Sequence, residues 1–451
     1  MSTRTATASG ARPCSCPLPL PCQCSYPTLL RARLRATRNE PLLRNGHVLT
    51  ASSMLTAVLG GLFWVLATRW YSADSVGRSY AALSAAGLLS GIGQFNLGDL
   101  MTRFLPTAGG RTRRLLLRSY AIATLASAAA AAVFLLVVPA VAPDLGFLRS
   151  PLVAAGFVVA TAGYTVFVLQ DGALTGLRRP HWVLGENALF SVLKAALLAA
   201  FAIWGLQSGV LLSWSGALVV SVTVANVYLF RRAVPHHQRG SGAAGPPPGL
   251  VRYAAADYAG LLLRLGAYSV LPLLVLNELG AAQNAYYSLA WVIAYTLYLA
   301  ALNMGSSLIV EAARDPGRLA EHGRRVLRHA ALMLAVAVAV LLVAAPWLLS
   351  LFGREYAEQG TLLLRLLALS ALPNLVVAIA VDVARSRRRM RTVIGLQAAE
   401  CGLVLGLAVW LVPVLGVDGA GVAWLAGLGV LAVPLLLTLP RWLPAPTPRR
   451  Q

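Results

Sequence analysis

Charged residues are scarce in this chain of 451 residues. They make up 12% of it, whereas hydrophobic residues make up 58%, and the mean hydropathy is +0.69. Soluble domains are about one quarter charged, so this composition excludes an ordinary soluble protein and predicts a membrane protein. The formal charge of +22 suggests nucleic-acid binding at first sight. We exclude that function because the positive residues lie in short loops between apolar stretches.

Motifs for nucleotide hydrolysis and for metal binding are also missing. The sequence holds no G-x-x-x-x-G-K-[ST] stretch, and its six histidines show no H-E-x-x-H spacing. We therefore expect no ATP hydrolysis by that route, no cofactor, no metal ion and no enzymatic activity. Lysine is nearly absent as well, because Lys194 is the only one.

Cysteine is rare outside the N-terminal tail. Four of the five cysteines lie in a proline-rich stretch, at Cys14, Cys16, Cys22 and Cys24. Paired C-x-C sequences can bind zinc, but the tail has neither helical nor strand periodicity. We interpret residues 1–46 as a disordered basic arm on the cytoplasmic side. It lacks the charged and apolar regions of a secretory signal.

Long apolar stretches fill almost all of the remaining chain. Residues 231–252, RRAVPHHQRGSGAAGPPPGLVR, form the longest internal segment that is neither apolar nor periodic, and their Gly, Pro and Ser content predicts an exposed cytoplasmic linker without helix or strand. Each half beside the linker holds six stretches of close to the 20 apolar residues that a spanning helix needs. The expected spans are 47–69, 79–105, 115–140, 148–170, 182–205, 209–230, 253–276, 284–310, 326–350, 360–383, 392–414 and 419–440.

The arginines fix the expected orientation. If spans alternate, nearly all loop arginines fall on one side, and only Arg69, Arg78, Arg149 and Arg354 fall on the other. The positive-inside rule then places both termini in the cytoplasm. The predicted fold is an all-α polytopic membrane protein of about twelve helices. It comprises an N-terminal six-helix bundle (47–230), a parallel C-terminal bundle (253–440) and a cytoplasmic tail (441–451).

The first two spans resemble a known family. RNGHVLTASSMLTAVLGGLFWVLATRWYSADSVGRSYAALSAAGLLS, followed by QFNLGDLMTRFLP at 94–106, is similar to the start of Wzx-like polysaccharide-biosynthesis flippases. These belong to the multidrug/oligosaccharidyl-lipid/polysaccharide (MOP) exporter superfamily. The resemblance is strongest over 44–120 and implies two six-helix bundles around a central cavity. Multidrug-extruding relatives often carry an acid in the first span, and none lies between Gly46 and Thr68 here.

Basic residues inside spans are the main candidate site residues, because charge in a bilayer is costly and usually functional. Arg264 lies within the seventh span, with Asp257 seven residues earlier on the same helical face and Pro272 eight residues later. We predict that Arg264 binds substrate, and a structural Arg–Asp pair is the alternative. Lys194 is central in the fifth span and is the second predicted substrate contact.

Secondary candidates are Arg103, Arg118, Asp257 and Glu400. Arg103 is spaced i,i+4 from Asp99, which favours a local ion pair, and Arg118 is similarly close to a span end. Glu400 has no local basic partner, so it either couples transport to protons or sodium or pairs with another helix. Hinge candidates are Pro272 and the pair Gly60 and Gly61 in the first span.

The resemblance and these cations predict a secondary transporter that flips a polyprenyl-diphosphate-linked oligosaccharide across the cytoplasmic membrane by alternating access, for cell-surface polysaccharide or lipopolysaccharide biosynthesis. Expected partners are the lipid-linked glycan, the bilayer and other polysaccharide-assembly proteins. A drug or small-molecule exporter of the same superfamily is an open alternative. A membrane glycan polymerase or ligase is disfavoured, because the expected outer loops are too short for an external active site.

Overall fold

The structure is a computed structural model that describes residues 59–240, 250–314, 319–387 and 389–443. The predictions about the N-terminal arm with its four cysteines, the start of the first span, residues 241–249 and residues 444–451 lie outside this part. So do the side chains of Asp99, Arg103 and Asp257. All regular elements in the described ranges are helices, which confirms the predicted all-α class.

Helices occupy the positions that the apolar stretches predict. The first part holds a helix over residues 59–70 and then α3 (Ala73–Gln94), α4 (Leu97–Phe104), α5 (Thr112–Val141), α6 (Pro151–Gly176), α7 (Pro180–Ile203) and α8 (Gly209–Tyr228). Short 3-10 turns over Leu105–Thr107, Gly109–Arg111 and Pro143–Arg149 join them. The second part holds α10 (Leu250–Leu279), α11 (Ala281–Arg314), α12 (Leu319–Ser350), α13 (Arg354–Ser386), α14 (Met390–Leu415), α15 (Val417–Leu437) and α16 (Leu439–Trp442).

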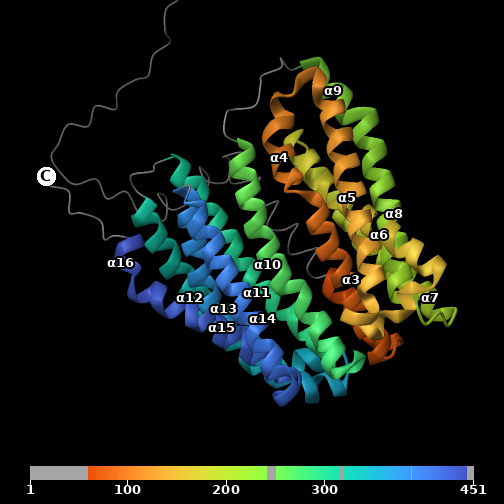
Figure 1. The fold of residues 1–451 in the computed structure, drawn as a ribbon, viewed down its shortest axis with the longest axis vertical. Helices are drawn as coiled ribbons and strands as arrows, with labels where there is room; N and C mark the ends of the chain where they lie inside the picture. The colour runs from red at the N-terminus through yellow and green to blue at the C-terminus, as the bar shows by residue number, and fades with distance from the viewer. Residues whose placement is uncertain (1–58, 241–249, 315–318, 388, 444–451) are drawn as a thin grey trace, which may run out of the picture. The chain divides into compact units, whose positions relative to one another are not determined.

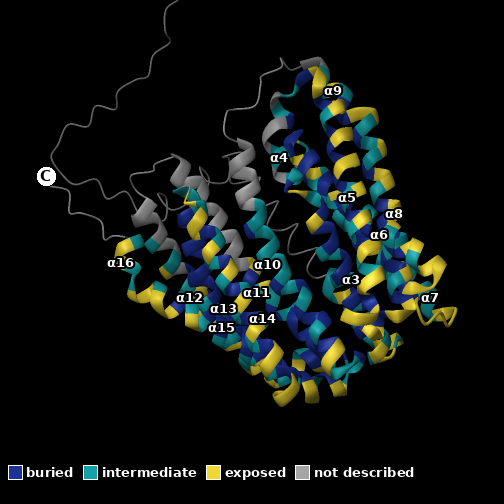
Figure 2. Cartoon of the chain, viewed as in Figure 1, coloured by how far each residue is buried: buried dark blue, intermediate teal, exposed yellow. Residues whose placement is uncertain are grey.

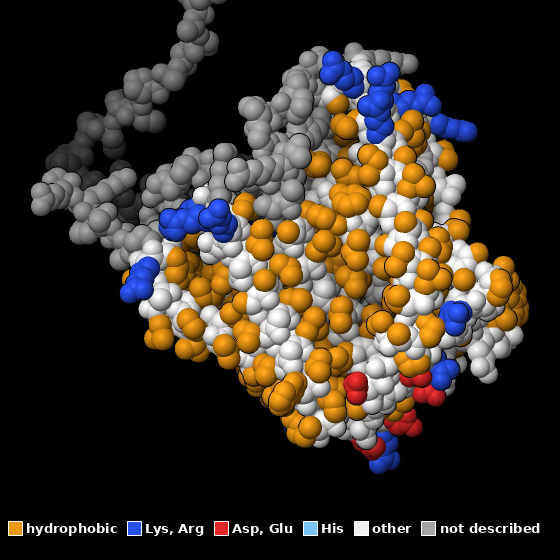
Figure 3. All heavy atoms as spheres, viewed as in Figure 1, with side chains coloured by type: hydrophobic (Ala, Val, Ile, Leu, Met, Phe, Trp, Pro, Cys, Tyr) orange, Lys and Arg blue, Asp and Glu red, His pale blue; other side chains and the backbone are white. Residues whose placement is uncertain are grey.

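The outer surfaces of these helices are apolar. Nine helices within the described residues are long and apolar enough to cross a membrane, judged by length and composition. Leu125 and Leu136 on α5 are 72% and 77% exposed, and Trp410 on α14 is 80% exposed. Figure 2 shows exposed residues along α5, and Figure 3 shows hydrophobic side chains over the middle of the visible face, with Lys and Arg gathered beside α9. Large apolar side chains pointing outward are expected where lipid replaces water, so the chain is a multi-pass membrane protein.

Helix α3 packs against helices from both the first and the second part of the chain. Among the later helices, α13 lies against α11, α12 and α15, whereas α3 contacts α5 and α6 on one side and α10 and α11 on the other. The contact between α3 and α11 is close because Gly77 has no side chain, and the buried Asn284 amide donates to the Gly77 carbonyl at 2.8 Å. The described residues form one compact unit, and the division into two bundles remains a prediction.

The second span is interrupted, which the sequence analysis did not predict. Instead of one helix over 79–105, α3 begins at Ala73, where the Ser72 hydroxyl accepts from the Ser75 amide at 3.3 Å. It ends at Gln94, because Phe95 and Asn96 adopt positive φ angles of 48° and 55°. Helix α4 then restarts the chain at Leu97. Neither break residue is Gly or Pro, although Gly93 and Gly98 flank them, and Asn tolerates the left-handed conformation better than most residues.

The expected structureless linker is wrong for residues 231–240. A π turn over Leu229–Ala233 continues α8, and α9 (Val234–Gly240) follows it. Pro235 has no backbone N–H to continue the helical hydrogen bonds, and it directly follows the π turn, which ends with the Val234 N–H donating to the Leu229 carbonyl. Burial of Ala233 and Val234 and a 2.8 Å hydrogen bond from the Gln238 amide to the Gly110 carbonyl hold this helix. Long-range packing thus stabilises a helix in a segment whose polar composition does not predict one.

Candidate functional site

A polar cavity of about 230 Å³ lies between α10, α13 and α14. The side chains around it are buried or half-buried, yet most carry charge or amide groups. Those that define its chemistry are Arg264, Tyr268, Asn374, Asp382, Arg385, Gln397 and Glu400. Such groups are rare in the interior of a membrane protein, so this cavity is the leading candidate site.

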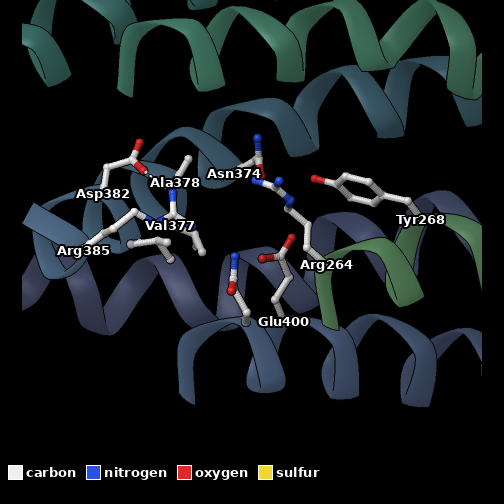
Figure 4. Close-up of a pocket in the computed structure, with 10 residues that line it drawn as sticks. Arg264, Tyr268, Asn374, Val377, Ala378, Asp382, Arg385 and Glu400 are labelled. Carbon is white, nitrogen blue, oxygen red and sulfur yellow. Dashed lines mark hydrogen bonds and ion pairs between the residues drawn. The ribbon is translucent and has the colours of Figure 1, made fainter. Parts of the chain in front are cut away.

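Arg264 projects into the middle of this cavity. Figure 4 shows its guanidinium between the side chains of Asn374 and Tyr268, with the Glu400 carboxylate on the facing helix. Glu400 is 5% exposed and lies close enough to interact electrostatically with Arg264. Glu400 Oε1 and Gln397 Oε1 are buried and have no hydrogen-bond partner among the described residues. This part of the site therefore presents the Arg264 guanidinium together with acceptor oxygens that its own residues leave unused.

The position of the cavity follows from helix periodicity. Arg264 and Tyr268 are four residues apart on α10, so they lie on one face. Gln397 and Glu400 are three residues apart on α14 and share a face for the same reason. Arg264 and Glu400 both lie near the middle of their 30- and 26-residue helices. The deepest part of the cavity is thus near the middle of the apolar span.

An ion pair marks the other end of the cavity. Arg385 Nη1 lies 3.2 Å from Asp382 Oδ1 near the end of α13. The turn after α13 carries further arginines, including Arg387 and Arg389. Burial lowers the pKa of Arg387 from its usual value, and the nearby positive charge of Arg389 lowers it further. The cavity therefore runs from the middle of the span towards an arginine-rich end.

An aromatic cluster supports the wall of the cavity. The Tyr268 ring lies 5.4 Å from Trp291, 5.7 Å from Tyr295 and 5.5 Å from Trp424, measured between ring centroids. Trp291 and Trp424 stack at 4.8 Å. Contacts of this kind restrict side-chain rotation. They hold Tyr268 beside Arg264.

Lys194 does not line this cavity. Its Nζ lies over the rings of Phe63 and Phe190, at 4.9 Å and 5.0 Å from their centroids. Both distances fit cation–π interactions. The structure therefore places the two predicted substrate cations in separate surroundings.

Of the remaining predicted residues, some do not line the cavity, and the structure does not describe the side chains of the others. Arg118 is exposed on α5. A methyl group added at Gly60 or Gly61 would meet nothing within 4 Å, so close packing does not explain these glycines. Pro272 lies inside α10, which continues past it to Leu279. The side chains of Arg103 and Asp257 are not described, so their predicted roles stay predictions.

Sequence reasoning missed the neutral members of the site. Tyr268, Asn374 and Gln397 carry no charge and stand out little in apolar helices. Their one signal is spacing, because Tyr268 is one turn from Arg264 and Gln397 is one turn from Glu400.

Comparison with known proteins identifies the fold. No family model and no curated protein sequence matches the chain. Among solved structures, the chain is similar to the lipid II flippase MurJ in its inward closed conformation, with a TM-score of 0.67, 10% identity and coverage of 87% of each chain. It is also similar to the MATE multidrug transporter DinF-BH, with a TM-score of 0.65, 13% identity and coverage of 89% of this chain and 96% of that one.

A third similar structure is the inward-facing conformation of a multidrug resistance MATE family transporter of the MOP superfamily. Its TM-score is 0.63 at 15% identity, with coverage of 86% of this chain and 96% of that one. The alignments span nearly all of both chains, although the sequences have diverged widely. The chain therefore has the all-helical fold that these MOP-superfamily transporters share.

Proposed function

We propose that the protein is a transporter that flips a polyprenyl-diphosphate-linked oligosaccharide across the cytoplasmic membrane by alternating access. The observation that carries this proposal is Arg264, a guanidinium held at the middle of an apolar span in a polar cavity. A diphosphate cannot cross apolar surroundings without a positive partner. A planar donor fork suits phosphate oxygens better than an ammonium group does.

The donors of Arg264 are available for a ligand. No described residue forms a hydrogen bond or ion pair with its guanidinium, although Tyr268, Tyr295 and Glu400 interact with it electrostatically. A structural arginine would be expected to fill its donors with protein acceptors. Arg264 instead faces open space in the cavity.

The arginine-rich end gives the substrate a route of entry. Arg385, Arg387 and Arg389 follow the cavity towards the end of α13, which the positive-inside rule places in the cytoplasm. An anionic headgroup would meet these charges first and Arg264 afterwards. In this proposal both termini are cytoplasmic, the product serves cell-surface polysaccharide assembly, and other assembly proteins are partners.

The connections at the opposite end leave little room for an external active site. A single residue, Gly280, joins α10 to α11, and another, Gly416, joins α14 to α15. Residues 351–353 join α12 to α13. A glycan polymerase or ligase would need catalytic groups there, so we favour transport over catalysis.

A drug exporter is the second candidate, and one observation favours it. The buried Glu400 carboxylate lies in the same cavity and keeps one unpartnered oxygen, which would suit a cationic drug. Arg264 beside it would repel such a cation. We therefore rank an anionic substrate first.

The experiment that tests this ranking uses the full-length protein in proteoliposomes. Accessibility of a fluorescent polyprenyl-diphosphate glycan to an external quencher reports flipping, and accumulation of a cationic rhodamine dye reports drug transport. Flipping of the glycan without dye transport is the expected result. Dye transport without glycan flipping would contradict the proposal and establish the exporter.

A further inference from the structure

The lipid-facing surface of α5 changes from apolar to basic along one stripe of the helix. Ile122, Leu125 and Leu136 are exposed on this stripe. Arg118 lies four residues before Ile122, and Arg114 lies four residues before Arg118; both arginines are exposed as well. Residues spaced by three or four share one face of a helix. The face that contacts acyl chains therefore also carries two arginines near the start of α5.

The length of α5 places these arginines at the level of the lipid headgroups. The helix has 30 residues and is about 45 Å long, whereas the hydrocarbon core of a bilayer is about 30 Å thick. After Arg118 the helix contains no further charged residue. The hydrocarbon region can therefore begin just beyond Arg118, and a long arginine side chain can extend from there to the phosphates.

The elements at this end of α5 provide no negative charge. Among the described residues, none forms a hydrogen bond or ion pair with Arg114 or Arg118. Helices α5, α8 and α9 contain no Asp or Glu, and neither do the turns Gly109–Arg111 and Leu229–Ala233. The two guanidinium groups thus lack an acidic partner on their own helix and on α8 and α9.

The acids of the other helices around α5 do not balance these arginines either. Asp171 on α6 and Glu186 on α7 have oxygens buried inside the bundle, whereas the arginines are exposed. Asp144 follows the opposite end of α5. The side chain of Asp99 on α4 is outside the description. On the face that Figure 3 shows, Asp and Glu side chains lie at the far end from α9.

A second lipid-facing helix ends in arginines at the same place. Val220, Val224 and Val227 are exposed on α8, and the exposed Arg231 follows at the same spacing. Helix α9, which continues from there, packs against the start of α5. Figure 3 shows Lys and Arg side chains gathered beside α9. The positive-inside rule places this end of the molecule in the cytoplasm.

We propose that Arg114 and Arg118 bind the headgroup of an anionic phospholipid in the cytoplasmic leaflet, with its acyl chains along Ile122 and Leu125. A guanidinium group matches the geometry of phosphate oxygens. A zwitterionic headgroup brings its own ammonium group, so it balances the arginines less well. Anionic lipids are enriched in the cytoplasmic leaflet and attract basic residues at its surface.

A lipid bound here would act on a part of the protein that is separate from the Arg264 cavity. Helix α5 does not line that cavity, so the phospholipid and the transported substrate do not compete for the same residues. The bound headgroup would hold the start of α5 at the membrane surface. This inference goes beyond the proposed function and does not depend on the identity of the substrate.

Native mass spectrometry of the full-length protein, purified in detergent and titrated with phosphatidylglycerol, tests the proposal. Phosphatidylcholine is the comparison lipid, because it has the same phosphate and acyl chains but no net charge. Wild type is compared with Arg118→Ala, Arg118→Lys and the double variant Arg114→Ala/Arg118→Ala. Arg149→Ala is the matched control, because Arg149 is an exposed arginine beyond the opposite end of α5.

Each arginine beside an anionic headgroup contributes about 5-fold in affinity. We therefore expect Arg118→Ala to weaken phosphatidylglycerol binding about 5-fold and the double variant about 25-fold. Arg118→Lys keeps the charge and should stay closer to wild type. Arg149→Ala should bind like wild type, and wild type should prefer phosphatidylglycerol to phosphatidylcholine.

Equal binding of phosphatidylglycerol by wild type and the double variant would overturn the proposal, as would equal binding of the two lipids by wild type. Polyprenyl diphosphate is a third probe, since its phosphates have the same chemistry. If it binds at Arg114 and Arg118 in preference to phosphatidylglycerol, these arginines serve a lipid-linked substrate and the proposal is wrong. All three probes are measured without flipping, so the result stands whether or not the proposed function holds.

Discussion

Substitution of Gly77 by alanine is expected to destabilise the contact between α3 and α11. An added Cβ would overlap the carbonyl oxygen of Ala281, and it would lie 2.7 Å from the Ala281 carbonyl carbon and 3.0 Å from the Ala285 nitrogen. All three are backbone atoms, so no side chain can rotate away, and the two helices must separate. Their separation also strains the hydrogen bond from Asn284 to Gly77.

The magnitude follows from packing and helix propensity. Overpacking of a core costs about 1–3 kcal/mol, and loss of a buried hydrogen bond adds about 1 kcal/mol. Alanine has a better helix propensity than glycine, which stabilises the helix by about 1 kcal/mol. A net loss of about 2 kcal/mol is therefore expected for Gly77→Ala.

Gly87 provides a matched control on the same helix, because an added Cβ there would meet nothing within 4 Å. Gly87→Ala should be neutral or stabilising by up to about 1 kcal/mol. The assay is the thermal unfolding of purified protein in detergent, followed by the amount that remains monodisperse after heating. Equal stability of Gly77→Ala and Gly87→Ala would refute the close approach of α3 and α11.

Two further predictions concern the lipid-facing surface and Lys194. Leu125→Arg places a charge on the exposed face in the middle of α5, so we expect membrane insertion to cost about 3 kcal/mol more. A glycosylation-mapping assay should then show a smaller membrane-inserted fraction. Normal insertion would mean that this face does not contact lipid. Lys194→Met removes cation–π contacts with Phe63 and Phe190 worth about 0.5–2 kcal/mol. It also removes a half-buried charge, so unfolding should shift by less than about 2 kcal/mol and flipping should fall less than in Arg264→Ala. A loss of flipping equal to that of Arg264→Ala would show that Lys194 also contacts the substrate.

The sequence predicted the helices well because an apolar stretch in a bilayer has only one stable backbone conformation. The interruption at Phe95 and Asn96 escaped prediction, since the two residues that adopt positive φ angles are neither glycine nor proline. Helix α9 escaped because its stability comes from long-range contacts, such as the one from Gln238 to Gly110, rather than from its own composition.

The candidate site was predictable in its charges but not in its pairing. Arg264 was recognisable because charge inside a span is rare. The closeness of Arg264 to Glu400 could not be predicted from the sequence. Periodicity shows which residues share a face of one helix, but it does not show which faces of different helices meet.

The most direct test of the account measures flipping of two fluorescent lipid-linked glycans in proteoliposomes. One glycan has a diphosphate linkage and the other an uncharged linkage. Wild type, Arg264→Lys and Arg264→Ala are compared. Arg365→Ala is the matched control, because Arg365 is an exposed arginine on α13 that donates to the Leu342 carbonyl and does not line the cavity. Loss of a charge-assisted hydrogen bond of about 1.5–3 kcal/mol predicts about 10–100-fold slower flipping of the diphosphate glycan by Arg264→Ala, partial activity in Arg264→Lys and normal activity in Arg365→Ala. Normal flipping of the diphosphate glycan by a folded Arg264→Ala protein would contradict the central claim that this arginine binds the diphosphate.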